Sequence, residues 1–457
     1  MTTTIAFLAF LPVAAAAFAV LPVRPAILAV FLGGWLVLPV GHFPDLAPEI
    51  VFPWMITGAV VPSSMLVTKA WIAPVVALAL ALAVDRARLA GWRPGAVDAA
   101  MAAFCLWPLA AGLVARAPDP APAVSALYLA GAWGAPWLLG RVWFADAAGR
   151  FTLIRGLALA GLACLPYAVL EGMRPPFLHE ALYAPHPWDR DGIVRYLGYR
   201  PMALFENGNQ YGIWVAMGAL SALWLAMARG DAPALPRVAL AATCTAIAIA
   251  SQSVGAVMMI VGGLALVWLM ASRLVLALIA AGALGAGAVL ALAAAGILPL
   301  EELVRGTAAG KALIEAFRDI GRFAFLWRFA QDINALSTLP ASPLIGAHDW
   351  DWFMGAGTRP WGTWQVILGQ FGLVGVGLVL AALLPGVLAA RAAAAGIAST
   401  DPGAAPRLLA AVLLAAMADA ALNSFLYFPA LLAAGAIAGG VRAAGRDGRH
   451  PPAAPPP

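Results

Sequence analysis

The chain has 457 residues, of which 63% are hydrophobic and 11% are charged, and its formal net charge is +5. About a quarter of the residues of an ordinary soluble domain are charged, so this composition excludes a soluble globular protein and predicts an integral membrane protein. The basic excess comes almost wholly from arginine, since Lys69 and Lys311 are the only lysines. In a membrane protein such an excess sets topology, and we expect no nucleic-acid partner.

Long uncharged runs predict the membrane-spanning helices. No charged residue occurs in 238–272, 274–300 or 360–390, and a bilayer core needs about 20 apolar helical residues. Inside lipid a segment must satisfy its own backbone hydrogen bonds, so we expect an all-α, polytopic transmembrane bundle. In chain order the predicted spans are 4–22, 25–41, 69–84, 97–115, 124–142, 152–171, 207–228, 236–251, 254–271, 274–297, 364–389, 407–422 and 429–443.

Two stretches near the N-terminus leave the number of spans at about 12–14. The first span, 4–22, lacks the basic start of a signal peptide, so we interpret it as retained. Segment 51–66 is uncharged but contains Pro53 and Pro62, and it either crosses the membrane, re-enters it or lies at the interface. The three cysteines are widely spaced in predicted helices and predict neither a disulfide framework nor a metal motif: Cys105, Cys164 and Cys244.

Arginines on alternate connections predict the orientation. If the spans simply alternate in direction, these arginines all lie on one face of the membrane, which the positive-inside rule makes cytoplasmic. They are Arg86, Arg88, Arg93, Arg141, Arg150, Arg229, Arg237, Arg273, Arg391, Arg407, Arg442, Arg446 and Arg449. The chain then divides into N-terminal spans (1–171), a first periplasmic loop (172–206), central spans (207–297), a second periplasmic loop (298–363), C-terminal spans (364–445) and a Pro- and Ala-rich tail expected to be disordered (446–457).

Polar residues gather at the end of the first loop. Arg195 and Arg200 are followed by Glu206, Asn207 and Asn209, where a span should begin. Polar side chains at this depth usually face a cavity or the bundle interior. The alternative is that Asn207 or Asn209 is simply a helix N-cap, although a cap does not require the two arginines before it.

The second loop carries an amphipathic segment, 308–332, with apolar residues at helical spacing. We expect it to lie at the membrane interface or across the top of the bundle. Arg318 and Arg322 share another of its faces. There they either hold an anion between them or pair locally with Glu315 and Asp319.

Tryptophans follow in the same loop. They either form an interfacial belt, the commoner role near a membrane boundary, or offer a stacking surface for sugar rings: Trp350, Trp352, Trp361 and Trp364.

In their order and spacing, these features resemble the O-antigen ligase/polymerase family of bacterial polysaccharide assembly. The resemblance runs from about residue 195 to 390, and the first 190 residues or so match only as a stack of spans. The motifs that carry it are Arg200 with Phe205-Glu206-Asn207-Gly208-Asn209, Ser251-Gln252-Ser253-Val254-Gly255-Ala256, Gly321-Arg322 with Trp327, Pro343-Leu344-Ile345-Gly346 and Gly369-Gln370-Phe371-Gly372-Leu373-Val374-Gly375.

The resemblance implies a multi-pass protein of the bacterial cytoplasmic (inner) membrane that transfers glycans at its periplasmic face. The donor would be an undecaprenyl-diphosphate-linked glycan and the acceptor a sugar hydroxyl on another lipid-linked glycan. Arginines would bind the diphosphate, without a metal or cofactor. Arg200 and Arg322 are the positions carried over as catalytic, with Arg195, Arg318, Asn207, Asn209 and Trp361 as substrate-binding residues.

The chain departs from the family pattern at two places. Ligases have a His-Asn pair where this chain has Trp361-Gly362, and many members have an arginine where it has Val254. A polymerase tolerates the missing histidine better than a ligase does. His348 or Glu206 could supply a base, although His348 could also be a structural loop histidine.

Two other classes remain open. One is a transporter or flippase for a lipid-linked or anionic substrate, which would need ionisable residues at mid-membrane depth. Within the predicted spans, Asp419 and Arg155 are the charged residues nearest to this depth, and each lies near the end of its span. The other is an inactive family member that binds other polysaccharide assembly proteins, for which Trp361 in place of histidine is the only support.

Overall fold

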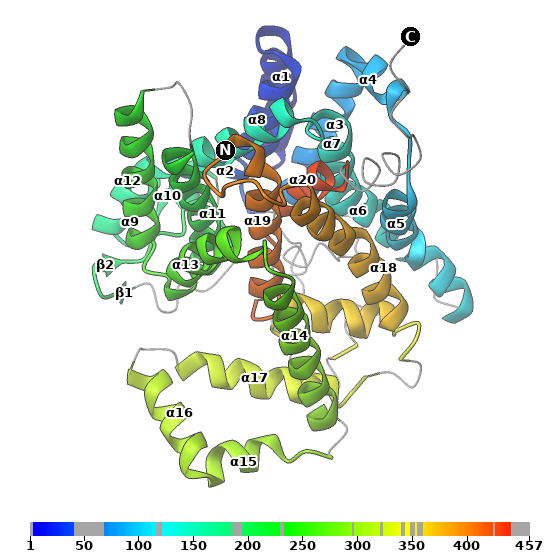
Figure 1. Ribbon diagram of the computed structural model, residues 1–457, viewed down its shortest axis with the longest axis vertical. Helices are drawn as coiled ribbons and strands as arrows, with labels where there is room; N and C mark the ends of the chain where they lie inside the picture. Colours follow the sequence, from blue (N-terminus) through cyan, green and yellow to red (C-terminus); the bar gives the residue numbers. More distant parts are fainter. Residues whose placement is uncertain are drawn as a thin grey trace, which may run out of the picture.

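Helices make up almost all of the regular structure, as the apolar runs predict (Figure 1). The computed structural model describes residues 3–40, 68–115, 121–183, 186, 194–228, 233–294, 297–319, 323–339, 343–347, 352–353, 360–423 and 426–439. Within these ranges the only strands form one short antiparallel hairpin.

The N-terminal part supplies the first group of bundle helices. They are α1 (Thr3–Val20), α2 (Val23–Val37), α3 (Lys69–Val84), α4 (Arg86–Gly91), α5 (Ala96–Ala115), α6 (Ala121–Leu129), the π-helix η3 (Ala130–Gly134), α7 (Ala135–Trp143), α8 (Ala147–Leu162) and α9 (Leu165–Met173). Segments α6, η3 and α7 follow one another directly, and together they match the predicted span 124–142.

The first loop contains α10 (Leu178–Leu182), β1 (Val194–Arg195) and β2 (Gly198–Tyr199). The central helices are α11 (Gly208–Met227), α12 (Ala234–Ala250), α13 (Val254–Leu269) and α14 (Arg273–Ala294). The turn at 251–253 separates α12 from α13, as its polar residues predict.

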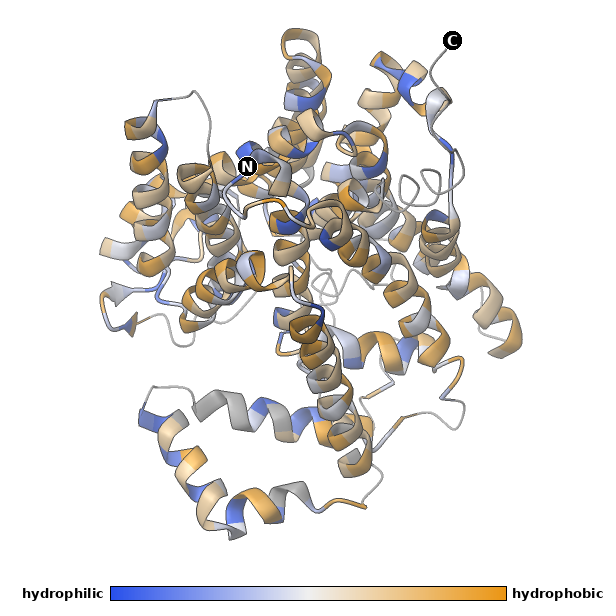
Figure 2. Ribbon diagram, viewed as in Figure 1, coloured by the Kyte–Doolittle hydropathy of each residue, from blue (hydrophilic) through white to orange (hydrophobic). Residues whose placement is uncertain are grey.

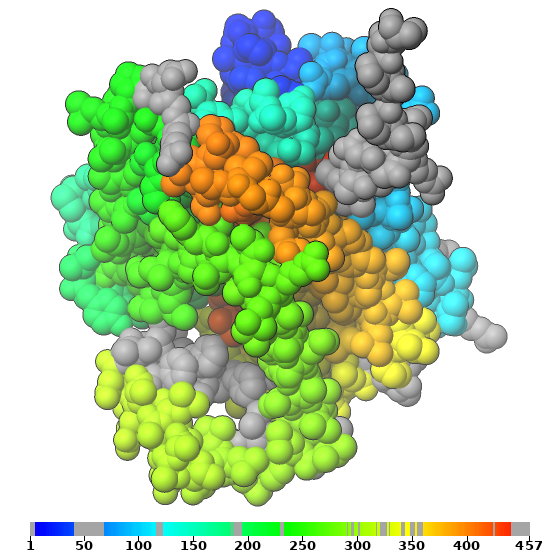
Figure 3. Space-filling model, in the orientation of Figure 1, coloured from blue at the N-terminus to red at the C-terminus, as the bar shows by residue number. Residues whose placement is uncertain are grey.

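The second loop contains α15 (Leu300–Gly306), α16 (Ala308–Asp319) and α17 (Phe323–Leu336). The pattern at 308–332 predicts one amphipathic helix, whereas the structure has two; Gly321, which has low helix propensity, falls between them in sequence. In the space-filling view α15 and α16 project at the bottom of the molecule, below α14 (Figure 3).

The C-terminal helices are α18 (Thr363–Ala393), the 3-10 helix η5 (Pro402–Ala404), α19 (Ala405–Asp419) and α20 (Pro429–Ala438). Among the described helices, seven are long and apolar enough to cross a membrane, and six more are apolar with 10–17 residues. Hydrophobic residues cover most of the bundle helices, α14 included, whereas α16 carries several hydrophilic ones (Figure 2). The chain is therefore a multi-pass membrane protein with an all-α bundle.

Small residues allow helices of the bundle to pack closely. A Cβ on Gly140 of α7 would overlap the Leu432 carbonyl of α20, and one on Gly218 of α11 would overlap Gly161 of α8. Because apolar side chains gain little by leaving lipid for protein, close backbone approach of this kind is a main source of association in membranes.

Helix α18 is broken at Gly372, which has a φ of 66° and a ψ of −172° inside the helix. Segment 343–347 of the second loop supplies hydrogen-bond partners for backbone amides at this break. The amides of Leu373 and Val374 donate to the oxygens of Pro343 and Leu344 at 2.9 and 3.1 Å. The amide of Ala347 donates to Gly369 oxygen at 2.8 Å. Two motifs of the family resemblance, 343–346 and 369–375, therefore lie against each other.

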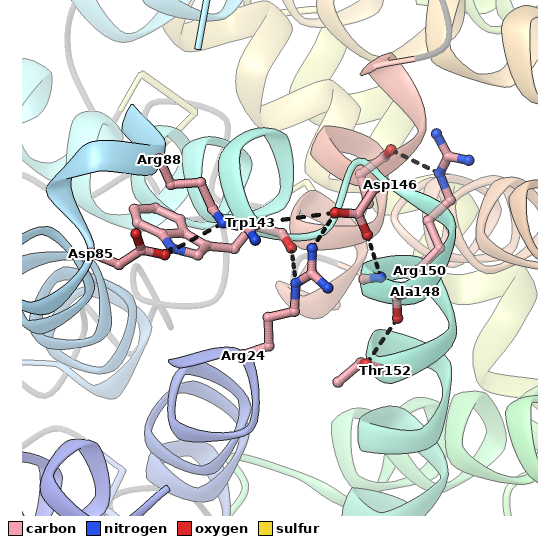
Figure 4. Close-up of polar contacts among 10 residues, drawn as sticks. Arg24, Asp85, Arg88, Trp143, Asp146, Ala148, Arg150 and Thr152 are labelled. Carbon is pink, nitrogen blue, oxygen red and sulfur yellow. Dashed lines mark hydrogen bonds and ion pairs between the residues drawn. The ribbon is translucent and has the colours of Figure 1, made fainter. Parts of the chain in front are cut away.

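The two ends of the bundle differ in chemistry. At one end, called here the arginine end, Arg24 pairs with Asp146, and Trp143 Nε1 donates to Asp85 at 3.1 Å (Figure 4). The same end holds the connection between α18 and α19, since Trp224 Nε1 donates to Ser399 oxygen at 2.9 Å. The opposite end, called the loop end, holds the described parts of both large loops and the turn at 251–253.

Candidate functional site

One buried carboxylate, which the sequence did not single out, fixes the first loop. Glu171 in the last turn of α9 accepts from the amides of Phe177 and Leu178 at 3.1 and 3.0 Å. Its other oxygen accepts from Met202 at 2.9 Å and Ala203 at 2.6 Å. The carboxylate thus links the start of the first loop to its end through backbone hydrogen bonds. One of its partners, Ala203, has a φ of 52°, which a non-glycine residue rarely adopts.

The turn between α12 and α13 packs against the hairpin of the first loop. Gln252 accepts from the amide of Leu197 and donates to the oxygen of Tyr199, both at 2.9 Å. Two further motifs of the resemblance, Ser251–Ser253 and the segment around Arg200, are therefore neighbours in space.

Arg200 lies across the first turn of α11. Its side chain is buried, and Nη2 donates to Asn209 Oδ1 at 2.6 Å. Gly208 gives the guanidinium room, because a Cβ there would overlap it. Asn207 is the N-cap, accepting from the amides of Asn209 and Gln210 at 2.9 Å. The cap alternative therefore holds for Asn207, whereas the side chain of Asn209 binds the arginine.

Glu206 is buried beside Lys69, the first residue of α3. The Lys69 ammonium donates to the oxygens of Leu204 and, at 3.4 Å, Trp35, and it lies 4.9 Å from the ring centre of Phe205. The amide of Glu206 donates to Gln210 Oε1 at 3.1 Å. Burial raises the pKa of Glu206 to about 8, although the charge of Lys69 and the nearby side-chain amide of Gln210 lower it.

A second cluster joins α17 to the start of α18 and the end of α19. The Arg328 guanidinium stacks on the Trp361 ring at 4.6 Å, and Nη1 donates to Asn423 Oδ1 at 2.9 Å. Asp332 accepts from the amides of Trp361 and, at 3.3 Å, Gly362. Burial raises the pKa of Asp332 to about 6, while those two amides and Arg328 favour its ionised form.

Aromatic rings connect the two clusters. Tyr427, four residues after Asn423, lies 5.6 Å from Trp214 of α11, and Phe428 lies 5.3 Å from Trp35. The ring of Trp35 is one of those beside Lys69. Both clusters therefore belong to one continuous region at the loop end.

The structure brings together only part of the predicted set. Arg200, Glu206, Asn207 and Asn209 share the first cluster, and Arg195 lies on β1 just before them. Arg318 is exposed on α16, which packs against α15 and α17. Trp361 belongs to the second cluster; Arg322 and His348 lie outside the described residues.

Several residues of the region were not predicted: Lys69, Glu171, Gln210, Arg328, Asp332 and Asn423. Gln210 bonds to Glu206, four residues away, at the end of the polar run. The other five act through a partner distant in sequence, such as Lys69 with Leu204, so no local motif marked them. A charged residue at the end of an apolar run was the one available signal, for Lys69 and Glu171.

No group of three or more His, Cys, Asp or Glu residues that could hold a metal ion occurs in the described part of the chain. Metal independence stays a prediction. Comparison of the chain with protein-family models, with curated proteins and with solved structures gave no match. The family resemblance therefore depends on the quoted motifs alone.

Proposed function

We propose that the chain is a membrane glycosyltransferase of the O-antigen ligase/polymerase type. It polymerises undecaprenyl-diphosphate-linked oligosaccharide at the periplasmic face of the bacterial inner membrane, in surface, lipopolysaccharide or exopolysaccharide synthesis. The observation that carries the proposal is Arg200, a buried arginine fixed by Asn209 at the first turn of α11. It lies at the end of the bundle opposite the arginine end, which the positive-inside rule makes cytoplasmic.

The chemistry needs positive charge at this place. When the acceptor oxygen bonds to the anomeric carbon, the bond to the diphosphate breaks and the diphosphate leaves with the electron pair. A fixed guanidinium can bind phosphate oxygens in a bidentate manner and stabilise that charge as it develops. The N-terminus of α11 adds the positive end of a helix dipole beside Arg200.

Polymerisation is favoured over ligation by the second cluster. Trp361 stands where ligases have histidine, and here its ring packs under Arg328, 4.6 Å from the guanidinium, and against Trp327. These contacts give the tryptophan a role in binding an arginine and do not supply a base.

The test is the surface glycan of cells in which the gene is deleted and then restored as variants. Arg200→Ala, alone or with Arg322→Ala, should leave single-repeat chains, because the diphosphate loses its fixed cation. Arg237→Ala is the matched control, since Arg237 bonds to the Ala228 oxygen near the arginine end and should leave chain length unchanged. Normal polymer from the Arg200→Ala variant would overturn the proposal.

Transport of a lipid-linked or anionic substrate is the second candidate, and the break in α18 favours it, because broken helices line many transporter sites. The same deletion separates the classes. Repeat units trapped at the inner leaflet would indicate a flippase, and finished polymer that never reaches its acceptor would indicate a ligase. Single-repeat chains indicate a polymerase.

A further inference from the structure

Two buried polar atoms in the segment whose Asn209 binds Arg200 have no hydrogen-bond partner among the described residues. They are Glu206 Oε2 and Gln210 Nε2, and both residues are 3% exposed. Buried polar atoms in folded proteins are nearly always paired, so an acceptor and a donor left open one turn apart require an explanation. A hydroxyl group would satisfy both, since it donates one hydrogen bond and accepts another.

The position of the pair is fixed from several directions. Gln210 Oε1 accepts from the amide of Glu206 at 3.1 Å, which holds the amide side chain beside the carboxyl residue. Lys69 binds the oxygen of Leu204, two residues before Glu206, and so attaches this segment to α3 and α2. Asn207 and Asn209, which lie between Glu206 and Gln210 in the sequence, are partly exposed, so the pair lies just below the surface of the loop end.

We propose that Glu206 accepts the proton of the acceptor hydroxyl, that Gln210 orients the hydroxyl oxygen, and that Lys69 is a positioning residue for Glu206. This inference rests on the proposed glycosyl transfer. In the step, the proton moves to Glu206 Oε2 and the oxygen bonds to the anomeric carbon. The bond from that carbon to the diphosphate breaks, and its electron pair leaves on the diphosphate beside Arg200.

The electrostatics agree with this role. A carboxylate whose pKa is raised by burial to about 8 is a stronger base than an exposed one. The charged or titratable groups that act on it are Lys69 of α3 and, from α6, Tyr128. Because the base works only when ionised, the rate should rise as the pH increases through the raised pKa of Glu206 and then level off.

The experiment uses the full chain in lipid nanodiscs. Its probe is the lipid-diphosphate-linked repeat unit isolated from cells that lack the gene. Glu206→Gln should lower kcat by about 10²- to 10⁴-fold, the usual contribution of a general base. Lys69→Met should move the rise of the pH profile to higher pH, because the charge that favours ionised Glu206 is lost. Lys69→Arg should largely restore the wild-type profile.

Controls separate this role from simple folding effects. Glu180→Gln changes an exposed carboxylate of α10 and should leave rate and profile unchanged. Gln210→Met removes the amide donor at similar volume. It should raise KM for the acceptor and move the pH profile to higher pH by less than Lys69→Met does, because Gln210 lowers the pKa of Glu206 less than Lys69 does. Isotope-edited infrared titration of the Glu206 carboxyl gives a readout that needs no turnover, and Lys69→Met should shift that titration upward.

Two outcomes have different meanings. If the wild-type chain elongates the probe but Glu206→Gln keeps its rate and pH profile, this inference is overturned and the proposed function stands. If the wild-type chain does not elongate the probe, the proposed function fails and the catalytic role of Glu206 fails with it. An infrared titration that Lys69→Met leaves unmoved overturns the role of Lys69.

Discussion

The acids at the two ends of the bundle have different partners. At the arginine end the buried Asp98 accepts two hydrogen bonds of 2.7 and 2.9 Å from Arg141, and the exposed Asp146 pairs with Arg24. At the loop end Glu206 and Asp419 each keep one oxygen without a partner among the described residues. Completed ion pairs maintain the fold, whereas open buried groups mark the places where a substrate is expected.

The loop end also contains acids with a purely structural role. Glu171 and Asp332 accept backbone amides, and in doing so they fix the first loop and dock α17 on the start of α18. The two ends therefore differ in the kind of partner: arginine side chains bind the acids at the arginine end, whereas backbone amides and the Asn423 side-chain amide bind Glu171, Asp332 and Asp419 at the loop end.

The largest effect on stability is expected at the arginine end. Asp98→Asn leaves the Arg141 guanidinium buried without its counter-ion and should cost about 3–5 kcal/mol of unfolding free energy. Unfolding in mixed micelles measures this loss. Chain length of the glycan made by the remaining folded protein should be unchanged, and shortened chains would contradict the division between the two ends.

Gly208→Ala should change the free energy of unfolding less than Asp98→Asn does, but it should strongly lower the rate of glycan elongation. The added methyl displaces the Arg200 guanidinium without altering any charge, so the rate of glycan elongation should fall about 10²-fold, as when one oxyanion-stabilising donor is lost. Gly262→Ala on α13 meets nothing within 4 Å and is the matched control. Equal rates for the two variants would show that the position of Arg200 is unimportant.

Asp332→Ala should have a moderate effect at the loop end. It leaves the amides of Trp361 and Gly362 without their acceptor and should cost about 1–3 kcal/mol. Release of α17 is measured by limited proteolysis of the second loop. Cleavage at the wild-type rate would show that this carboxylate does not dock the helix.

The smallest effect is a pH dependence at the same residue. The folded state raises the pKa of Asp332 from 3.8 to about 6, so it binds the proton more tightly than the unfolded chain. Its contribution to stability therefore falls as pH rises through that window. Asp332→Asn keeps an acceptor but does not titrate, so its stability relative to wild type should rise with pH by on the order of 1 kcal/mol. If the melting temperatures of the two proteins differ by the same amount at every pH in this window, the raised pKa of Asp332 is contradicted.

The spans could be predicted from the sequence because the length of an uncharged apolar run can be compared directly with the thickness of the bilayer core. The predicted 69–84 coincides with α3, and 97–115 differs from α5 by one residue. The break at Gly372 could not be predicted, because a glycine within an apolar run looks like any other packing position. It becomes necessary only when segment 343–347 supplies the missing hydrogen bonds.

The candidate site was predictable only where its residues cluster in sequence. Arg200 to Asn209 could be recognised as a polar run at the start of a span. Lys69 and Glu171 could not, because their partners lie 135 and 31 residues away. Sequence spacing predicts contacts along one helix, whereas these depend on how helices pack.

The central claim is that the loop end performs glycosyl transfer through Arg200. The most direct measurement is elongation of the isolated lipid-diphosphate-linked repeat unit by the purified chain in nanodiscs, with Arg200→Ala beside wild type. We predict a ladder of polymer from wild type and unextended repeat unit from the variant. Ladders of equal length from both proteins would contradict the account.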